Sequence, residues 1–228
     1  ALEKEGVDLV EIGVPFSDPL ADGPVIQASS QRSLERGTTL EKILGMVRRV
    51  RRHSEIPLAL MSYFNPILHY GLSRFAKDAK RAGVDGVIIP DLPPDEGREA
   101  SIIFAKAGLD LVYLLAPTST LARQAMISKA SRGFIYFVSL TGVTGAGRGI
   151  SQSVLKQVQA LRRKTARAVC VGFGVSTPEQ ARRVARSADG VIVGSSIVKA
   201  LAERSSWSAE RFTKKFIRPL RLALGNAK

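Results

Sequence analysis

The chain has 228 residues, 45% of them hydrophobic, and this length and composition fit one large domain better than two. Its formal net charge is +14, from 34 Lys and Arg against 20 Asp and Glu, but the basic residues are spread along the chain without a nucleic-acid-binding signature. The sequence has no apolar run long enough to cross a bilayer, and we expect no signal peptide. We therefore expect neither nucleic acid nor membrane as a partner.

The metal-ligating and thiol residues are few and far apart. Cys170 is the single cysteine and lies in the apolar stretch "AVCVGFGV", which predicts a buried thiol in a reducing, cytoplasmic environment. The two histidines, His53 and His69, do not have the spacing of a zinc site with each other or with Cys170. We expect no metal site.

Strand-like and helix-like segments alternate along the chain. Seven short runs rich in β-branched residues predict strands, at 7–14, 56–64, 86–92, 109–117, 133–140, 168–175 and 190–198. Segments of helical periodicity lie between and after them, at 24–37, 39–53, 71–83, 95–108, 120–133, 151–165, 177–188, 196–205 and 209–224. Strict alternation means parallel strands with right-handed crossovers. Seven such strands in one continuous domain over 1–228 favour a (β/α)8 TIM barrel over an open doubly wound sheet.

A barrel of this kind carries its active site in the loops that follow the strands. Polar residues fall there, with Glu11 inside the first strand and Asp18 and Asp22 in the loop "PFSDPLADGP" behind it. Later loops, at 141–149, 172–176 and 193–196, are rich in glycine. Glycines and hydroxyls ahead of helix N-termini offer backbone N–H groups to a phosphate. The sequence therefore predicts a phosphate-bearing substrate, and it contains neither a P-loop nor a dinucleotide fingerprint.

Glu11 is the most unusual residue of the first strand. A carboxylate in a buried strand is costly unless it is paired, hydrated or used in chemistry, so the position needs an explanation. One explanation is a strand end at which Glu11 turns to solvent. The other is catalysis, because an apolar barrel mouth can raise the pKa of Glu11 until it exchanges protons near neutral pH.

The stretch "LVEIGVPFSDPLADGPVIQ" resembles the signature of the tryptophan synthase α subunit family. The segments "DGVIIPDLPPDE", "YFVSLTGVTGAG", "VGFGVSTPEQ" and "GVIVGSSIV" follow in the order in which that family has them. The resemblance covers essentially the whole chain. It implies a lyase of tryptophan biosynthesis that cleaves indole-3-glycerol phosphate to indole and glyceraldehyde 3-phosphate by retro-aldol chemistry, without a metal or cofactor of its own.

The resemblance also assigns roles to individual residues. It implies that Glu11 is the general acid/base, that Asp22 is the second catalytic carboxylate and that Tyr136 lies near the substrate in a catalytic or binding role. It assigns phosphate to Gly145, Gly174, Gly194 and Ser195, and it places Thr144 in a loop that closes over the substrate. For Tyr136 a core position with a bonded hydroxyl is an equal alternative. Tyr63 and Met61 either line an indole pocket or fill the barrel, and for Asp18 we favour a turn or interface role over chemistry.

A partner is implied as well. The family works as an α2β2 complex with a separate β subunit, which carries pyridoxal phosphate and takes the indole. Two features depart from the family. Its members begin with a further strand and helix, so we expect this barrel to lack its first strand, and the charge of +14 is unusually high. Two other functions stay open, namely a different phosphate-binding TIM-barrel enzyme of the pathway and a non-catalytic basic barrel that binds a partner.

Overall fold

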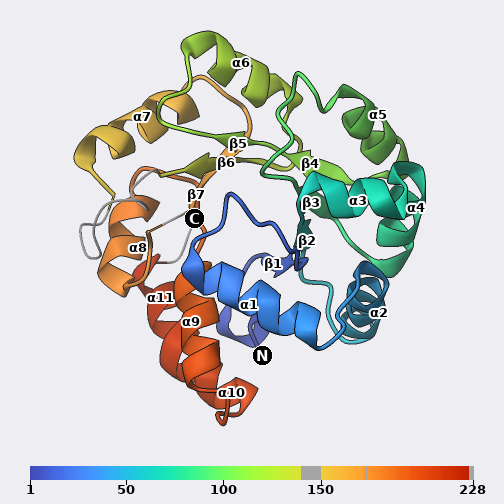
Figure 1. Ribbon diagram of the computed structural model, residues 1–228. Helices are drawn as coiled ribbons and strands as arrows, with labels where there is room; N and C mark the ends of the chain where they lie inside the picture. Colours follow the sequence, from blue (N-terminus) through green and yellow to red (C-terminus); the bar gives the residue numbers. More distant parts are fainter. Residues whose placement is uncertain (140–149, 173, 226–228) are drawn as a thin grey trace. The chain divides into compact units, whose positions relative to one another are not determined.

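The computed structural model describes residues 1–139, 150–172 and 174–225 (Figure 1). Its strands are β1 (Val10–Gly13), β2 (Leu58–Met61), β3 (Gly86–Ile88), β4 (Asp110–Val112), β5 (Leu114–Leu115), β6 (Phe134–Val138), β7 (Ala168–Gly172) and β8 (Gly190–Val191). Each of the seven segments predicted as strands contains strand structure. The eighth label arises because the predicted strand 109–117 is divided at Tyr113 into β4 and β5.

The described chain forms two compact units, and the first comprises 8–114 and 129–133. Its sheet has the order β1-β2-β3-β4, with the three strand pairs parallel. Its helices are α1 (Pro24–Glu35), α2 (Leu40–Arg51), α3 (Phe64–Tyr70), α4 (Leu72–Ala82) and α5 (Arg98–Ala107). β2 and β3 are buried almost throughout, which is typical of parallel strands covered by helices.

Helix α3 was not expected, because the sequence predicts a strand as far as residue 64. The helix begins at Phe64, whose backbone N–H donates to Asp91 Oδ1 at 2.9 Å. This carboxylate satisfies one of the free N–H groups at the helix start, as a capping side chain does. Gly71, at φ +92°, then separates α3 from α4.

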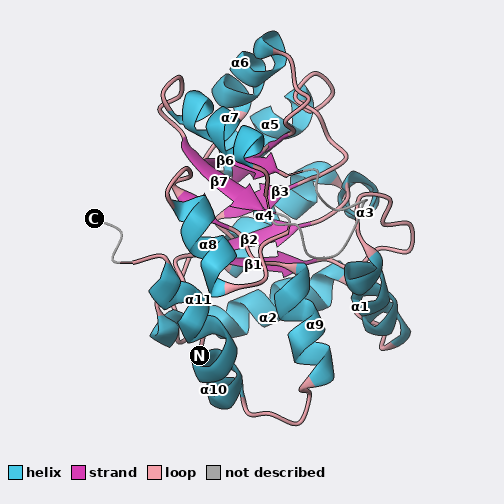
Figure 2. Cartoon of the chain, turned by 90° about the vertical axis from the view of Figure 1, so that its left-hand side faces the viewer, coloured by secondary structure: helices cyan, strands magenta, loops and turns pink. Residues whose placement is uncertain are grey.

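The second unit comprises 1–7, 115–128 and the chain from Phe134 onward. Its sheet has the order β5-β6-β7-β8, with β6 parallel to β7 and β7 parallel to β8. Helix α6 (Leu121–Ala130) begins in this unit. The others are α7 (Gln152–Arg162), α8 (Pro178–Ala185), α9 (Ser195–Glu203), α10 (Ala209–Phe212) and α11 (Arg218–Ala223) (Figure 2). Among the described residues, no helix has both the length and the apolar character that a membrane span requires.

The predicted helix 209–224 is interrupted. A π-helical turn, Thr213–Ile217, stands between α10 and α11. Pro219 has no N–H to offer the carbonyl four residues earlier, so the regular α-helical ladder cannot pass this point.

The N-terminal segment packs on these last helices. Leu2 and Val7 lie against the buried side chains of Ala200, Phe212 and Ile217. The short 3₁₀ turn Glu3–Glu5 is fixed there by polar contacts too, because Arg218 Nε donates to Glu5 Oε2 at 2.6 Å and Arg221 Nε donates to the Gly6 carbonyl at 2.6 Å. The N-terminal segment and the helices from α9 to α11 therefore stabilise the same corner of this unit.

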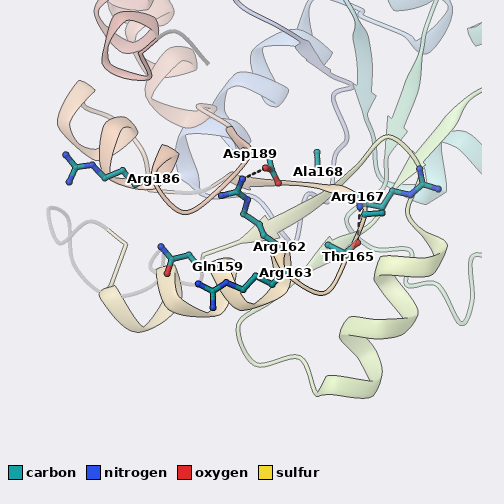
Figure 3. A pocket seen from close by; sticks show the side chains of 9 residues that line it. Gln159, Arg162, Arg163, Thr165, Arg167, Ala168, Arg186 and Asp189 are labelled. Carbon is teal, nitrogen blue, oxygen red and sulfur yellow. Dashed lines mark hydrogen bonds and ion pairs between the residues drawn. The ribbon is translucent and has the colours of Figure 1, made fainter. Parts of the chain in front are cut away.

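The two units start their strands in the same way. Asp85, just before β3, accepts from the Leu58 N–H at 2.9 Å and from Arg51 at 2.6 Å. Asp189, just before β8, accepts from the Val169 N–H at 2.9 Å. It also accepts from Arg162 at 2.5 Å (Figure 3). In each unit one aspartate thus joins the beginning of the preceding strand to an arginine at the end of a helix.

A cavity of about 670 Å³ lies beside Asp189 and is lined by several arginines. The ion pair between Arg162 and Asp189 accounts for part of this positive charge. The residues that line the cavity are Gln159, Arg162, Arg163, Thr165, Ala166, Arg167, Ala168, Arg186 and Asp189. In Figure 3, Arg162 is directed to Asp189, while the side chain of Arg186 points away from that pair. Basic side chains at helix C-termini also offset the helix dipole. Much of the positive charge here is accounted for by strand anchoring and helix ends, without a ligand.

Candidate active site

Glu11 lies in β1, opposite Ala59 of β2. Its Oε1 atom is buried and has no hydrogen-bond partner among the residues that the structure describes. Burial raises the pKa of the Glu11 carboxyl to about 7, because the charged form is poorly solvated there. A group with this pKa is present in both protonation states near neutral pH and can give or take a proton. The alternative of a solvated strand end is wrong for this carboxyl.

The loop after β1 brings Asp22 back toward the sheet's carboxyl end. Its backbone closes two turns, since the Leu20 N–H donates to the Asp18 carbonyl at 2.9 Å and the Asp22 N–H donates to the Pro19 carbonyl at 3.0 Å. Gln27 of α1 donates to the Asp22 carbonyl at 2.8 Å. Burial raises the pKa of the half-buried Asp22 carboxyl, and a hydrogen bond from the Tyr63 hydroxyl opposes that rise.

Asp18 differs from Asp22 although both lie in this loop. Its side chain is exposed and accepts from the Ser17 hydroxyl at 2.5 Å. Its carbonyl closes the turn to Leu20, whose side chain is 94% exposed. These contacts agree with a turn role for Asp18, and they leave an apolar side chain at the tip of the loop.

Tyr63 is buried at the residue before α3 and reaches the same loop. Its hydroxyl accepts from the Ala21 N–H at 2.8 Å, and its ring packs against Phe16 with centroids 5.4 Å apart. Burial is the main reason why the pKa of Tyr63 rises to about 12, and the negative charge of Asp22 adds to it. Phe16 has no role in the sequence-based prediction. Its position, five residues after Glu11 in a proline-rich loop, carried no signal for this contact.

Tyr136 lies in β6, in the second unit, and is buried. Its ring occupies the space beside Gly172 in β7. A Cβ atom at Gly172 would lie 2.5 Å from both Cε1 and the hydroxyl oxygen of Tyr136. The glycine at 172 therefore makes room for this tyrosine, a requirement that neither residue reveals in the sequence alone.

Three of the predicted phosphate residues, Gly174, Gly194 and Ser195, are described, and all three lie in the second unit. Gly174 has φ +82°, a left-handed conformation that glycine adopts without strain. Gly194 is the N-cap of α9 and Ser195 is the first helical residue, so backbone N–H groups at this end are available to an anion. The hydroxyl of Ser196 donates to the Val175 carbonyl at 3.2 Å and so joins the two loops. Ser196 was not predicted, and Thr144 and Gly145 lie outside the described residues.

No group of three or more His, Cys, Asp or Glu side chains with the arrangement of a metal site occurs in the described part of the chain. Cys170 lies in β7 and is partly exposed rather than buried, which corrects one expectation. In the first unit the structure brings Asp22 and Tyr63 together. They lie in the segments that follow β1 and β2, and β1 is the strand that carries Glu11.

Comparison with known proteins gives a consistent result. The family model described as tryptophan synthase alpha chain matches residues 1–221. The tryptophan synthase alpha chain of Geobacter sulfurreducens is 53% identical over 225 residues, which is 99% of this chain and 85% of the relative.

Solved structures agree with the sequence matches. The structure of the alpha chain from Legionella pneumophila has a TM-score of 0.88 at 36% identity, covering 99% of this chain and 83% of that one. A structure of the tryptophan synthase α2β2 complex from Pyrococcus furiosus has a TM-score of 0.85 at 36% identity, covering 98% of this chain and 87% of that one. The (β/α)8 TIM-barrel class predicted from the sequence is confirmed by these matches.

Proposed function

Because the chain belongs to the tryptophan synthase alpha chain family, we propose that it cleaves indole-3-glycerol phosphate to indole and glyceraldehyde 3-phosphate with Glu11 and Asp22 as its catalytic carboxylates. The observation that carries the site assignment is the buried carboxyl of Glu11, which lacks a partner among the described residues and has a pKa of about 7. The family match favours this lyase over both alternatives, another phosphate-binding barrel and a non-catalytic one.

The reaction needs three changes at the substrate. A proton is added to C3 of the indole, the hydroxyl next to the breaking carbon–carbon bond loses its proton and becomes the aldehyde, and positive charge develops at the indole nitrogen. Glu11 has both protonation states available near neutral pH, so it can serve the proton transfers. Asp22 can accept the indole N–H and offset its charge as the transition state forms.

The direct test is release of indole from indole-3-glycerol phosphate by the purified chain. We expect a rate that saturates with substrate and a stoichiometric yield of glyceraldehyde 3-phosphate. Indole can be followed by its absorbance and the triose phosphate by a coupled dehydrogenase. A folded protein that releases neither product, alone or with a cognate β subunit, contradicts the proposed function.

The partner and cofactor assignments follow the family. The chain works with a tryptophan synthase β subunit in an α2β2 heterotetramer, as the Pyrococcus furiosus complex illustrates. We propose that it needs no cofactor of its own and that pyridoxal phosphate belongs to the β subunit. A cytoplasmic location and a single domain over 1–228 are further proposals. The single-domain proposal is supported by one family model that spans both units.

The phosphate site leads to a prediction at Gly194. Among the described residues, no atom lies within 4 Å of the position that a Cβ would take there, so Gly194→Ala should fold normally. We propose that the substrate phosphate approaches this backbone, and an added methyl group would then crowd it. The Michaelis constant should rise by about tenfold while kcat changes little.

Steady-state kinetics with indole-3-glycerol phosphate measures this effect. Gly225→Ala is a control for added volume, because no atom of the described residues lies within 4 Å of the Cβ position at Gly225 either; its φ of +72° adds strain. An unchanged Michaelis constant in a Gly194→Ala variant with normal melting places the phosphate elsewhere.

A further inference from the structure

We propose that Tyr63 is a positioning residue whose hydroxyl bridges the Ala21 backbone N–H and the Asp22 carboxylate, and so holds the catalytic loop in place before substrate binds. The inference rests on the proposed role of Asp22. It differs from the sequence-based expectation for Tyr63, which is a contact with the indole ring or simple filling of the barrel.

The first support is the fixed position of the tyrosine itself. Its side chain is only 6% exposed, and its ring packs against Phe16 at the beginning of the loop. Tyr63 immediately precedes α3, and the bond from the Phe64 N–H to Asp91 Oδ1 fixes the start of that helix. The hydroxyl is therefore presented from a rigid element to a loop that has no regular secondary structure.

The second support is the balance of hydrogen-bond donors and acceptors. A tyrosine hydroxyl has one hydrogen to donate and also accepts. Here it accepts from the Ala21 N–H at 2.8 Å, which leaves its hydrogen for the carboxylate of Asp22. The proposed bond to Asp22 uses the one hydrogen of the hydroxyl, so the hydroxyl does not donate to the substrate.

The third support is electrostatic. Burial raises the pKa of Asp22, and the hydrogen bond from Tyr63 lowers it. Asp22 must be ionised to accept the indole N–H and to offset positive charge. The hydroxyl thus favours the ionised form that the proposed chemistry needs. Asp91 is the other charged group that acts on Tyr63.

The test compares Tyr63→Phe with Tyr70→Phe. The first change keeps the ring against Phe16 and removes only the hydroxyl. The second change removes a hydroxyl that donates to the carboxylate of Asp78 at 2.9 Å. This bond joins α3 to α4 and does not involve the loop. Tyr70→Phe therefore controls for the loss of any tyrosine–aspartate bond.

For Tyr63→Phe we expect kcat to fall about 10- to 100-fold, the range for loss of a hydrogen bond to a charged group, with KM changed less than about threefold. The acid limb of the kcat/KM profile should move to higher pH, because Asp22 loses the bond that lowers its pKa. In the substrate-free protein, the Ala21 amide should exchange its hydrogen faster. Tyr70→Phe should leave all three measurements near wild type.

Two results overturn the proposal. Unchanged exchange at Ala21 shows that the hydroxyl does not hold the loop. Faster exchange with unchanged kcat and an unmoved acid limb shows that the contact does not position Asp22. Amide exchange needs no substrate, so the loop contact is tested even where the wild-type chain releases no indole, and failure of the proposed function is recognised separately by the missing product.

Discussion

Replacing Glu11 by Gln should lower the rate of indole release by about 10²-fold or more, the range expected for loss of a general acid/base. The amide keeps the shape of the side chain and removes the group that titrates at about pH 7. The measurement is kcat for indole release, with circular dichroism to show that the variant is folded.

Glu55→Gln is the matched control, because Glu55 is exposed and precedes β2. It should retain wild-type activity. A Glu11→Gln protein with near-normal turnover contradicts the role given to Glu11.

The same substitution should change how stability depends on pH. Glu11 has its ordinary pKa of 4.5 in the unfolded chain and about 7 in the folded one, so the folded state holds the proton more tightly. The stabilisation from the protonated side chain is fully present below pH 4.5 and is lost as the pH rises through about 7. The shift corresponds to about 3 kcal/mol at most.

Urea unfolding at about pH 5 and pH 8 measures this difference. The wild type should lose more stability between the two than Glu11→Gln, which carries no such group. Above pH 7 the Glu11→Gln variant should therefore be more stable than the wild type, and it should also be nearly inactive. A purely structural role for Glu11 does not predict this combination.

Replacing Asp22 by Asn should also lower kcat by about 10²-fold, and it should weaken substrate binding less than it slows turnover. The charge of Asp22 matters most when the indole nitrogen becomes positive, which happens in the transition state. Steady-state kinetics separates kcat from KM.

Asp18→Asn is the control from the same loop. Asp18 is exposed and closes a turn, so the chain alone should keep its activity within a few-fold. If Asp18→Asn is as damaging as Asp22→Asn, the effect belongs to the loop as a whole and not to the second carboxylate.

The elements that the sequence predicted well are those with local causes. Short β-branched runs mark the strands, and a Thr cap with Pro at the first turn marks α8, where Thr177 and Gln180 form a complete capping box. Glu11 attracted attention because a carboxylate in a buried strand is unusual, whereas Asp22 was distinguished from Asp18 only by the resemblance to the family, and the catalytic roles of both stay predictions.

The features that the sequence did not reveal depend on residues far apart in the chain. Helix α3 begins where it does because Asp91, 27 positions away from Phe64, caps it. The Tyr63 hydroxyl meets the Ala21 N–H across 42 positions. Likewise, the need for glycine at 172 follows from the ring of Tyr136 on the neighbouring strand. Periodicity and local propensity carry no information about such contacts.

The most direct test of the account is the titration of the Glu11 carboxyl in the folded, substrate-free protein. Carboxyl ¹³C NMR can follow it, and the Glu11→Gln variant assigns the resonance by its disappearance. The account predicts a midpoint near pH 7, because burial without a hydrogen-bond partner among the described residues disfavours the charge. A midpoint near the ordinary value of 4.5 would show a solvated or paired carboxylate and would contradict Glu11 as the proton carrier.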